Sequence, residues 1–358
     1  MIDKDLISKY AYLDKSAMLA RVFSYPNDLK DAVSRYSGLR LQFEVPKPLK
    51  GITIAGMGGS FIGAFFLQDL LQDEWELPLF TIKDVYLPAF IDKHHLLVAV
   101  SYSGNTEETI RIIVEARKKG VPTVAVTSGG LIAEHAEKLG YPVVKLPPGL
   151  APRAAFPYIL TALTAIVDSV VPSTNLTQSV AEAASFLERH CDNLLHIALD
   201  LSEWMLQNYL TNRLLVVYGY RPYLSACYRL KTQINENAKF HVFFSELPES
   251  NHNEIMGWET PSNLFTLTVR ANEEPPHLRY RMEFLLKLWS ERGVPFREVK
   301  PAKGNRLEEL ISLFYIFDLA SVLLALKRGV DPTPVETISQ LKKYLDTRIN
   351  LRDVLKPQ

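Results

Sequence analysis

The 358-residue sequence is poor in cysteine, which limits the cross-links and metal sites that it supports. Its two cysteines, Cys191 and Cys227, lie far apart in apolar or amphipathic segments. Neither a disulfide framework nor a zinc cluster is therefore expected, and both residues are interpreted as buried, reduced thiols. Histidines and carboxylates also fail to cluster at metal-ligand spacing, so we expect no metal and no cofactor.

The sequence also lacks an excess of charge of either sign and a long hydrophobic run. It has 40 acidic and 40 basic side chains, whereas nucleic-acid-binding proteins usually carry a basic excess on one face. No segment reaches the roughly 18 uninterrupted apolar residues of a membrane span, and Met1 is followed by Ile-Asp-Lys-Asp instead of an apolar signal segment. We therefore expect no nucleic-acid or membrane partner, and a cytoplasmic location.

The sequence does contain a repeated order of short apolar run, Gly/Ser-rich turn and helical periodicity, which is typical of an α/β fold with parallel sheets. The first set of predicted strands is at residues 51–55, 79–82, 96–100, 123–126 and 142–145, with helices at 61–71, 106–119 and 131–139. The second set is at 214–218, 242–244, 264–268 and 296–299, with helices at 224–239, 275–291 and 307–327.

The length exceeds the size at which one core usually keeps growing, so two doubly wound α/β domains are expected. We predict an N-terminal helical segment at residues 1–45, interrupted at Tyr25-Pro26-Asn27, and a first domain at 46–185. A helical stretch from 151 to about 210 leads into a second domain at 186–330. The run Asp331-Pro332-Thr333-Pro334 ends that domain, and a final helix follows at 331–358.

A glycine-rich turn, Gly56-Met57-Gly58-Gly59-Ser60, lies between the first predicted strand and a helix. Parallel sheets bind ligands at this end of their strands, and a helix N-terminus offers free N–H donors to phosphate. A dinucleotide-binding turn is disfavoured because Ile62 occupies the position of its third glycine, and a Walker loop lacks its lysine. A purely structural tight turn remains an alternative.

A second turn, Ser101-Tyr102-Ser103-Gly104-Asn105-Thr106, follows the third predicted strand. The hydroxyls of Ser101, Ser103 and Thr106 would donate to phosphate oxygens without adding charge, whereas the alternative interpretation is a cluster that caps the following helix. A third turn, Thr127-Ser128-Gly129-Gly130, is either a neighbouring contact or a plain loop.

These turns resemble the sugar isomerase (SIS) domain family, and Ser-Tyr-Ser-Gly-Asn-Thr-Glu-Glu-Thr is a specific match. The resemblance covers both halves and implies two SIS domains, each an αβα sandwich, that bind a phosphosugar. It implies that the phosphate is held by Gly58, Gly59, Ser60, Ser101, Ser103 and Thr106. Because SIS domains also occur in regulators and amidotransferases, the match gives the ligand class and leaves the chemistry open.

Two further segments offer groups for proton transfer. Moving a proton between C1 and C2 of a sugar requires a base, and ring opening requires an acid. Glu236, in Asn-Glu-Asn-Ala-Lys, ends a predicted helix and would suit the first role, although exposure to solvent is the ordinary fate of such a residue. His252, in Ser-Asn-His-Asn-Glu, titrates near neutrality and would suit the second, with a surface histidine as the alternative.

Together with Pro-Pro-Gly-Leu-Ala-Pro-Arg, these segments resemble the bifunctional phosphoglucose/phosphomannose isomerases over nearly the whole chain. The resemblance implies that Glu236 is the base, that His252 opens the ring, and that Arg153 stabilises the cis-enediolate. It also implies that the last helix supplies a lysine that assists His252 and a threonine that contacts the sugar. The candidates are Lys342 or Lys343 and Thr333 or Thr337, and we assign Lys342 and Thr337.

The resulting hypothesis is a metal-independent aldose–ketose isomerase that interconverts glucose 6-phosphate and mannose 6-phosphate with fructose 6-phosphate. The resemblance further implies a homodimer with a shared active site. The alternatives are a non-catalytic SIS protein that senses a phosphosugar, for which no helix-turn-helix segment is seen, and an amidotransferase, for which no glutaminase domain is seen.

Overall fold

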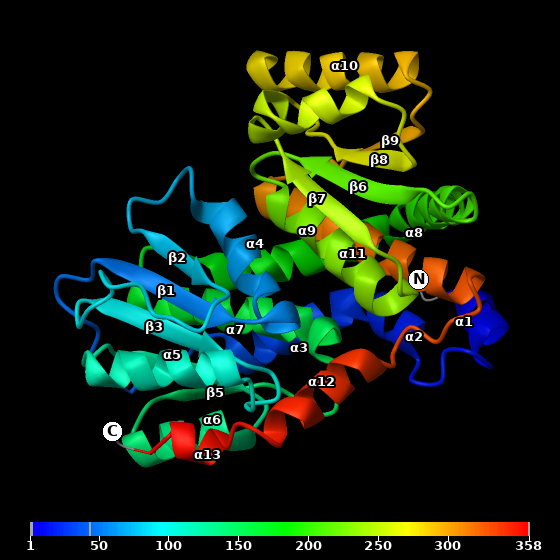
Figure 1. Ribbon diagram of the computed structural model, residues 1–358. Coiled ribbons are helices and arrows are strands. Elements are labelled where there is room, and N and C mark those ends of the chain that lie inside the picture. Colours follow the sequence, from blue (N-terminus) through cyan, green and yellow to red (C-terminus); the bar gives the residue numbers. More distant parts are fainter. Residues whose placement is uncertain (1–2, 43, 357–358) are drawn as a thin grey trace. The chain divides into compact units, whose positions relative to one another are not determined.

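The computed structural model describes residues 3–42 and 44–356, which form two compact units (Figure 1). The first-sheet unit comprises Asn27–Ala184 and Val335–Gln358, and the second-sheet unit comprises Met1–Pro26 and Ser185–Pro334. Each unit is therefore assembled from two separate stretches of the chain. The domain ranges given above stay a prediction, because a compact unit need not coincide with a domain of a family.

The first-sheet unit contains a five-stranded parallel sheet of order β2-β1-β3-β4-β5. Its central strands are continuous apolar runs buried on both faces, as parallel strands covered by helices require. Helices α4 and α7 lie on one face, and α5 and α6 on the other (Figure 1). The strands are β1 Gly51–Gly56, β2 Leu79–Ile82, β3 His95–Val100, β4 Thr123–Thr127 and β5 Val143–Lys145.

Helix α3 starts at Tyr25 and Pro26, which belong to the second-sheet unit, and its remaining residues belong to the first-sheet unit. Pro26 lies in the first turn of α3, a position that suits proline because no helical hydrogen bond is lost there. The N-terminal helical segment is thus broken just before Tyr25 and not at residues 25–27. The helices are α3 Tyr25–Tyr36, α4 Ile62–Leu71, α5 Glu107–Lys118, α6 Gly130–Leu139, α7 Phe156–Val170, α12 Glu336–Asp346 and α13 Leu351–Val354.

The second-sheet unit contains a four-stranded parallel sheet of order β7-β6-β8-β9. Its strands correspond in order to β2-β1-β3-β4, so β6 matches β1 and β8 matches β3. The strands are β6 Leu214–Gly219, β7 Val242–Glu246, β8 Leu264–Val269 and β9 Phe296–Val299. The predicted fold class, with two doubly wound parallel sheets, is confirmed.

Helices α8, α9 and α11 cover one face of the second sheet and α10 covers the other (Figure 1). Helix α11 is the core helix of this unit, and its N-terminus carries a capping box made by Asn305 and Glu308. By length and composition it could cross a membrane, as could the segment Pro152–Val170, but 94% and 83% of their apolar windows are buried. The remaining helices are α1 Lys4–Tyr10, α2 Met18–Phe23, α8 Leu176–Tyr209, α9 Leu224–Gln233, α10 Pro276–Glu291 and α11 Arg306–Lys327.

Two helix predictions need correction. The stretch expected from 151 to about 210 is broken at residues 171–175, which contain Pro172, and it starts as a 3₁₀ turn, Pro152–Ala155. The helix expected at 224–239 is α-helical only to Gln233 and continues as a π-helical turn, Ile234–Ala238. Since π-turns are rare and occur often at functional sites, this departure draws attention to Glu236.

Candidate functional site

The first turn of the site joins β1 to α4 and packs directly against a distant 3₁₀ turn. Gly58 has a φ of +51°, a left-handed conformation that glycine adopts without strain. A Cβ on Gly59 would lie 2.7 Å from the backbone nitrogen of Arg153 and 2.8 Å from the carbonyl carbon of Pro152. Only glycine permits this approach, which places buried Arg153 beside the predicted phosphate turn.

The second turn, after β3, is held to the first by hydroxyl hydrogen bonds. The Tyr102 N–H donates to Oγ of Ser60 at 3.0 Å, and the hydroxyls of Ser101 and Thr106 are 2.8 Å apart. The Gly104 N–H donates to Ser101 Oγ at 3.1 Å. The predicted phosphate residues Ser60, Ser101 and Thr106 therefore meet at the carboxyl edge of the first sheet.

Thr106 is the N-cap residue of α5, as the capping interpretation expected, but its side chain makes no capping hydrogen bond. Its hydroxyl instead pairs with Ser101, so the cluster serves the turn and not the helix end. Ser103 is exposed, and its Oγ accepts from the Asn105 N–H at 3.3 Å. Ser103 therefore lies on the rim of the turn and remains open to a ligand.

The third turn, 127–130, supports the second one. The Ser128 hydroxyl donates to the Tyr102 carbonyl at 2.6 Å, and Thr127 donates to the Gly129 carbonyl at 2.8 Å. A Cβ on Gly104 would lie 1.8 Å from that same Gly129 oxygen. Both hydroxyls donate to backbone carbonyls of the protein, so this turn supports the structure beside the candidate phosphate site.

Tyr102 is a supporting residue that the sequence did not single out. Its hydroxyl donates to the Pro147 carbonyl at 2.8 Å and accepts from the Leu150 N–H at 2.7 Å. It thereby ties the Ser101 turn to the loop that leads to Arg153. The cluster of neutral hydroxyls at helix N-termini, with the backbone of buried Arg153 beside it, has the composition of a site for a phosphorylated ligand.

In the second-sheet unit, the predicted base Glu236 lies half-buried in the π-helical turn that follows α9. The turn ends at Lys239, which has a φ of +56°. Its Nζ donates to the Glu236 carbonyl at 2.6 Å and to the Pro332 carbonyl at 3.1 Å. The backbone that carries Glu236 is thus closed by Lys239 and held to the segment that follows α11.

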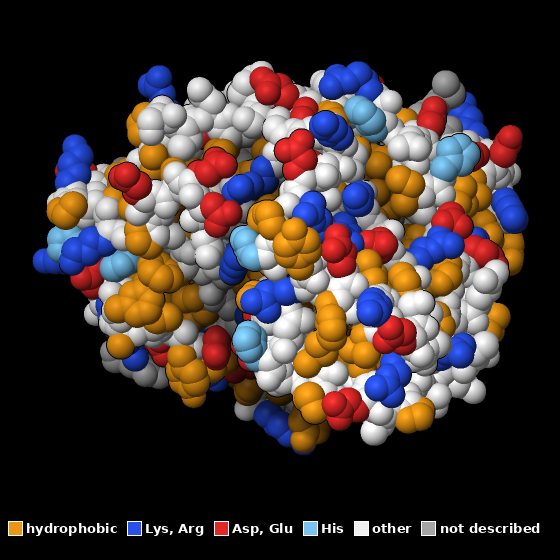
Figure 2. Space-filling model, turned by 90° about the horizontal axis from the view of Figure 1, so that it is seen from above, with side chains coloured by type: hydrophobic (Ala, Val, Ile, Leu, Met, Phe, Trp, Pro, Cys, Tyr) orange, Lys and Arg blue, Asp and Glu red, His pale blue; other side chains and the backbone are white. Residues whose placement is uncertain are grey.

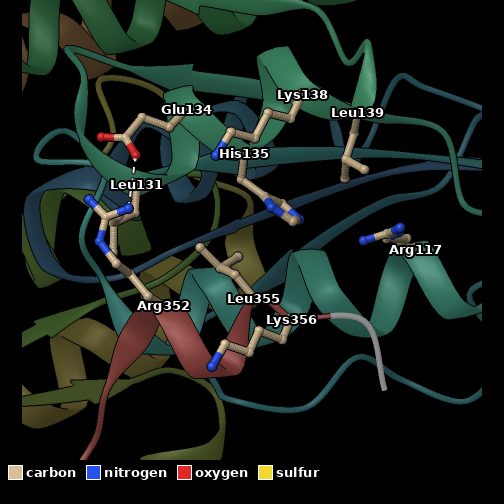
Figure 3. A pocket seen from close by; sticks show the side chains of 9 residues that line it. All are labelled: Arg117, Leu131, Glu134, His135, Lys138, Leu139, Arg352, Leu355 and Lys356. Carbon is tan, nitrogen blue, oxygen red and sulfur yellow. Dashed lines mark hydrogen bonds and ion pairs between the residues drawn. The ribbon is translucent and has the colours of Figure 1, made fainter.

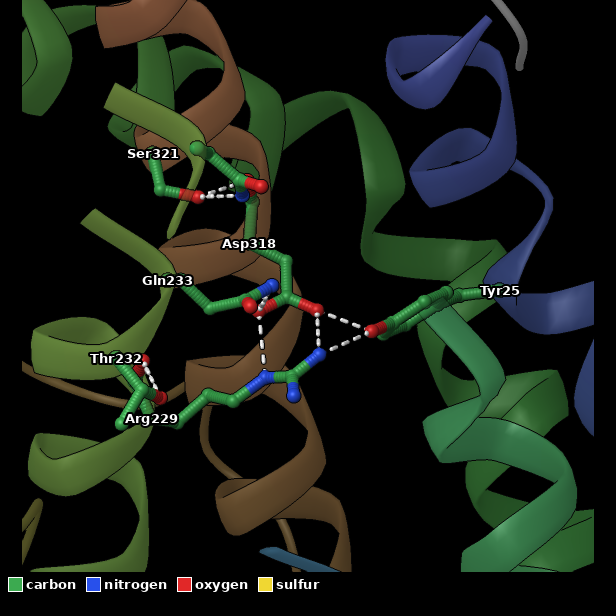
Figure 4. A network of polar contacts seen from close by, with 7 residues as sticks. Tyr25, Arg229, Thr232, Gln233, Asp318 and Ser321 are labelled. Atoms are coloured by element: carbon green, nitrogen blue, oxygen red, sulfur yellow. Dashed lines mark hydrogen bonds and ion pairs between the residues drawn. The ribbon is translucent and has the colours of Figure 1, made fainter. Parts of the chain in front are cut away.

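Buried polar side chains of α9 and its π-turn form hydrogen bonds with side chains of α11, and we call this row of contacts the polar ladder (Figure 4). Arg229 donates to both carboxylate oxygens of Asp318, at 2.8 and 2.7 Å, and Gln233 donates to Asp318 at 2.8 Å. Asn237 donates to the Ser321 hydroxyl at 2.9 Å. Because these three donors recur every four residues, they fix the side of the helix on which Glu236 projects.

Tyr25 completes the ladder from the N-terminal stretch of the same unit. Its hydroxyl donates to Asp318, and Arg229 approaches the same hydroxyl oxygen at 3.1 Å. Burial, followed by the charge of Asp318, holds the pKa of Tyr25 well above its usual value. Tyr25 therefore stays a neutral donor, and Asp318 is neutralised by Arg229 inside the core.

His252 lies in a 3₁₀ turn, Glu249–His252, after the end of β7, and its side chain is exposed. The neighbouring Glu254 is held by the Tyr218 hydroxyl and by Ser245, whose Oγ donates at 2.6 Å. Glu236, by contrast, precedes β7. Since the strand Val242–Glu246 is about 13 Å long at 3.3 Å per step, Glu236 and His252 of one chain lie at opposite edges of the second sheet.

The C-terminal candidates occupy α12 and the segment before it. Thr337 and Lys342 on α12 are exposed, as is Lys343, whereas Thr333 belongs to the second-sheet unit. The structure therefore brings Ser60, Ser101, Thr106 and Arg153 together and leaves Thr337 and Lys342 on an uncovered helix.

The carboxyl edge of the second sheet is filled by its own side chains. Tyr220, after β6, donates to Glu274 and accepts from the Ala271 N–H at 2.8 Å. Arg270, after β8, forms ion pairs with Glu274 and Glu298. Burial opposes ionisation of Glu274, but Arg270 and Tyr220 outweigh it and hold its pKa below the usual value. The polar side chains that follow β6 and β8 are thus bonded to one another, unlike exposed Ser103 in the turn after β3.

Among residues 3–42 and 44–356, no group of three or more His, Cys, Asp or Glu side chains is placed to hold a metal ion. The backbone of Arg153 lies beside the glycine-rich turn, and Arg153 is buried.

Comparison with known proteins adds family information to this geometry. The SIS domain family matches residues 82–167, and the bacterial phospho-glucose isomerase C-terminal SIS domain family matches residues 204–345. The bifunctional phosphoglucose/phosphomannose isomerase of Aquifex aeolicus is 32% identical over 311 residues, which cover 83% of this chain and 91% of that protein.

Two further proteins, one compared by sequence and one by structure, are also similar to this chain. The D-glucosamine-6-phosphate 4-epimerase of Sulfolobus acidocaldarius is 30% identical, over 88% of this chain and 93% of that protein. The structure of the C-terminal domain of glucosamine-fructose-6-phosphate aminotransferase from Francisella tularensis gives a TM-score of 0.66 at 16% identity, over 88% of this chain and 98% of that one. The latter match supports the fold alone.

Proposed function

Because the chain belongs to the bifunctional phosphoglucose/phosphomannose isomerase family, we propose that it interconverts glucose 6-phosphate and mannose 6-phosphate with fructose 6-phosphate. The observation that carries the proposal is the meeting of Ser60, Ser101 and Thr106 with Arg153 at one sheet edge. These residues come from three separate segments of the sequence, and the phosphate of the substrate is proposed to bind where they meet.

In the proposed reaction, the hydroxyl turns hold the sugar phosphate and the backbone N–H groups of the α4 and α5 N-termini add donors. Gly58 and Gly59 let the backbone approach the phosphate closely, and Ser103 contributes from the rim. The phosphate would thus be bound without a lysine or an arginine in the turn itself. Binding energy from this remote group positions C1 and C2 for proton transfer.

Glu236 is the proposed base. It removes the proton from C2 of the open-chain aldose, which leaves a cis-enediolate with the negative charge on O1. After the hydroxyl proton of O2 has passed to O1, Glu236 returns its proton to C1, and C2 becomes the carbonyl carbon of the ketose. Arg153 stabilises the negative charge of the enediolate, and its position beside Gly59 supports this role. Since no metal is required in this scheme, we propose that the activity is metal-independent.

His252 is proposed to open the sugar ring by transferring a proton to the ring oxygen, with Lys342 assisting it and Thr337 contacting the sugar. Because Glu236 and His252 of one chain lie at opposite ends of β7, we propose that a second copy supplies His252. Phe243 and Met256, on elements that flank His252, are 53% and 59% exposed, which supports burial of this surface in a homodimer.

A coupled assay on fructose 6-phosphate tests the proposal. Glucose 6-phosphate and mannose 6-phosphate should both form, at rates that EDTA leaves unchanged. A parallel reaction with glucosamine 6-phosphate tests the chemistry named for the Sulfolobus acidocaldarius relative. Epimerisation of that substrate without any aldose from fructose 6-phosphate would replace the proposal, and binding without turnover of either would favour a non-catalytic sensor.

Replacing the base sharpens the test. Glu236→Gln should lower kcat by about 10²–10⁴-fold, because the amide cannot accept the proton, and should leave phosphosugar binding nearly intact. Glu246→Gln, at the exposed end of β7, is a matched control that should retain full activity. Unchanged turnover in Glu236→Gln would refute the assignment. The proposed setting is a cytoplasmic sugar-phosphate pathway.

A further inference from the structure

A pocket of about 310 Å³ lies in the first-sheet unit between α5, α6 and α13 (Figure 3). None of its lining residues belongs to the turns that carry Ser60 and Ser101. The volume is at the lower end of the range for small-molecule sites. It is therefore large enough for more than a single ion and is separate from the candidate phosphosugar site.

Helix α13 forms one wall and is attached mainly by apolar contacts. Leu351, Val354 and Leu355 pack against the core cluster between the first sheet and helices α5 and α6. Arg352 also forms an ion pair with Glu134 of α6 at 3.3 Å. The pocket lies beside this attachment, so a ligand in it would contact both α6 and the C-terminal end of the described chain.

The polar lining of the pocket is strongly cationic. Arg117, Lys138, Arg352 and Lys356 contribute positive charge, although Arg352 is paired with Glu134 of the lining and Lys356 is paired with Asp353 outside it. Among the ion pairs found within residues 3–42 and 44–356, none includes Arg117 or Lys138, and the lining carboxylate of Glu134 pairs with Arg352. On the face drawn in Figure 2, by contrast, acidic and basic side chains are interspersed.

His135 adds an enclosed polar atom without a partner. It projects from α6 toward the space between Leu355 and Arg117 (Figure 3). Its Nε2 is buried and has no hydrogen-bond partner among the described residues. Burial, followed by the charges of Arg117 and Lys138, lowers the pKa of His135. An anion in the pocket would offset the charges of Arg117 and Lys138 and would offer a hydrogen-bond acceptor to the His135 ring.

We propose that this pocket is a binding site for a small molecule that carries two phosphate groups. Arg117 and Arg352 come from different walls, and each guanidinium matches the geometry of one phosphate. Lys138 and Lys356 add point charges around the same hollow. Bound in this way, the ligand bridges α13 to α5 and α6 and fixes the segment that continues from α12, the helix that bears Thr337 and Lys342.

Inorganic pyrophosphate is the probe, and the histidine ring signals in NMR spectra are the readout. The His135 signal is assigned by its loss in His135→Gln, and its pKa is measured with and without pyrophosphate. We expect pyrophosphate to raise that pKa. In the double variant Arg117→Gln/Lys138→Gln, both exposed positions, the effect should require a pyrophosphate concentration at least about tenfold higher.

Two comparisons separate this site from its alternatives. The double variant Arg281→Gln/Lys287→Gln removes two exposed charges from α10 and should behave like the parent chain. Ser101→Ala weakens the candidate phosphosugar site and should leave the His135 response intact. The inference is overturned if pyrophosphate leaves the His135 signal unmoved, or if it moves it equally in the Arg117→Gln/Lys138→Gln chain. Either result can be obtained whether or not the chain has isomerase activity.

Discussion

The side-chain amide of Asn237 donates to the hydroxyl of Ser321 at 2.9 Å. Asn237 immediately follows the proposed base, Glu236, in the sequence. Both groups are buried, and both belong to the ladder that ties α9 and its π-turn to α11. The orientation of Glu236 is therefore linked to the core of the second-sheet unit.

Ser321→Ala tests this link. The buried amide of Asn237 would lose its partner, which should cost about 1–3 kcal/mol in the free energy of unfolding. If the ladder positions Glu236, kcat should fall while KM changes little, and Ser321→Thr should restore part of the loss. Ser202→Ala, which removes a buried hydroxyl bonded to the Leu199 carbonyl, is the matched control and should lower stability without lowering kcat.

Mixing two inactive chains tests the proposed shared site. Glu236→Gln and His252→Gln should each be inactive alone, since each lacks one proton-transfer group. In an equal mixture, half of the dimers contain one chain of each kind and one intact site, so about one quarter of the parent activity should return. No recovery after refolding or co-expression would show that each site draws both residues from one chain.

Gly59→Ala tests the contact between the phosphate turn and Arg153. The new Cβ would lie 2.7 to 2.9 Å from backbone atoms of Pro152 and Arg153, so one of the two turns must move. A displacement of about 1 Å at a catalytic site costs on the order of 10²-fold, and kcat/KM should fall by that order. Gly257→Ala, where a Cβ has open space, should leave kcat/KM unchanged.

His135 gives a pH-dependent contribution to stability whose sign is fixed by its environment. Burial, then Arg117 and Lys138, lower its pKa in the folded chain, so below about pH 6.5 the unfolded chain binds the proton more readily. The parent chain should therefore lose stability as the pH falls from about 6.5 through the folded pKa. His135→Gln should lose less in urea unfolding measured without phosphate, and an equal loss would contradict this account.

Much of the fold followed from local patterns in the sequence. The central strands β1 and β3 are continuous apolar runs, and each is followed by a turn rich in Gly and Ser, so both strands and their edge were predictable. The proximity of the Ser60, Ser101 and Thr106 hydroxyls was predictable for the same reason, because parallel strands end at one edge.

Other features depend on contacts that no local pattern encodes. The neighbourhood of Gly59 and Arg153 depends on how α7 packs against α4. The π-turn at Glu236 depends on the register between α9 and α11, which Arg229, Asp318 and Asn237 set through buried hydrogen bonds. The sequence did not indicate that Arg229 is buried either, since arginine is seldom buried unless it is paired.

The contacts among polar side chains at the carboxyl edge of the second sheet predict how many sugar-phosphate molecules bind to each chain. Two sheets of matching strand order would suggest two equivalent receptors for a sugar phosphate, but Tyr220, Arg270 and Glu274 occupy the place in one of them with their own mutual contacts. Titration with a sugar phosphate should accordingly saturate at one molecule per chain. In the proposed function, the first sheet therefore supplies the receptor for the phosphate and the second sheet supports the carboxylate of Glu236.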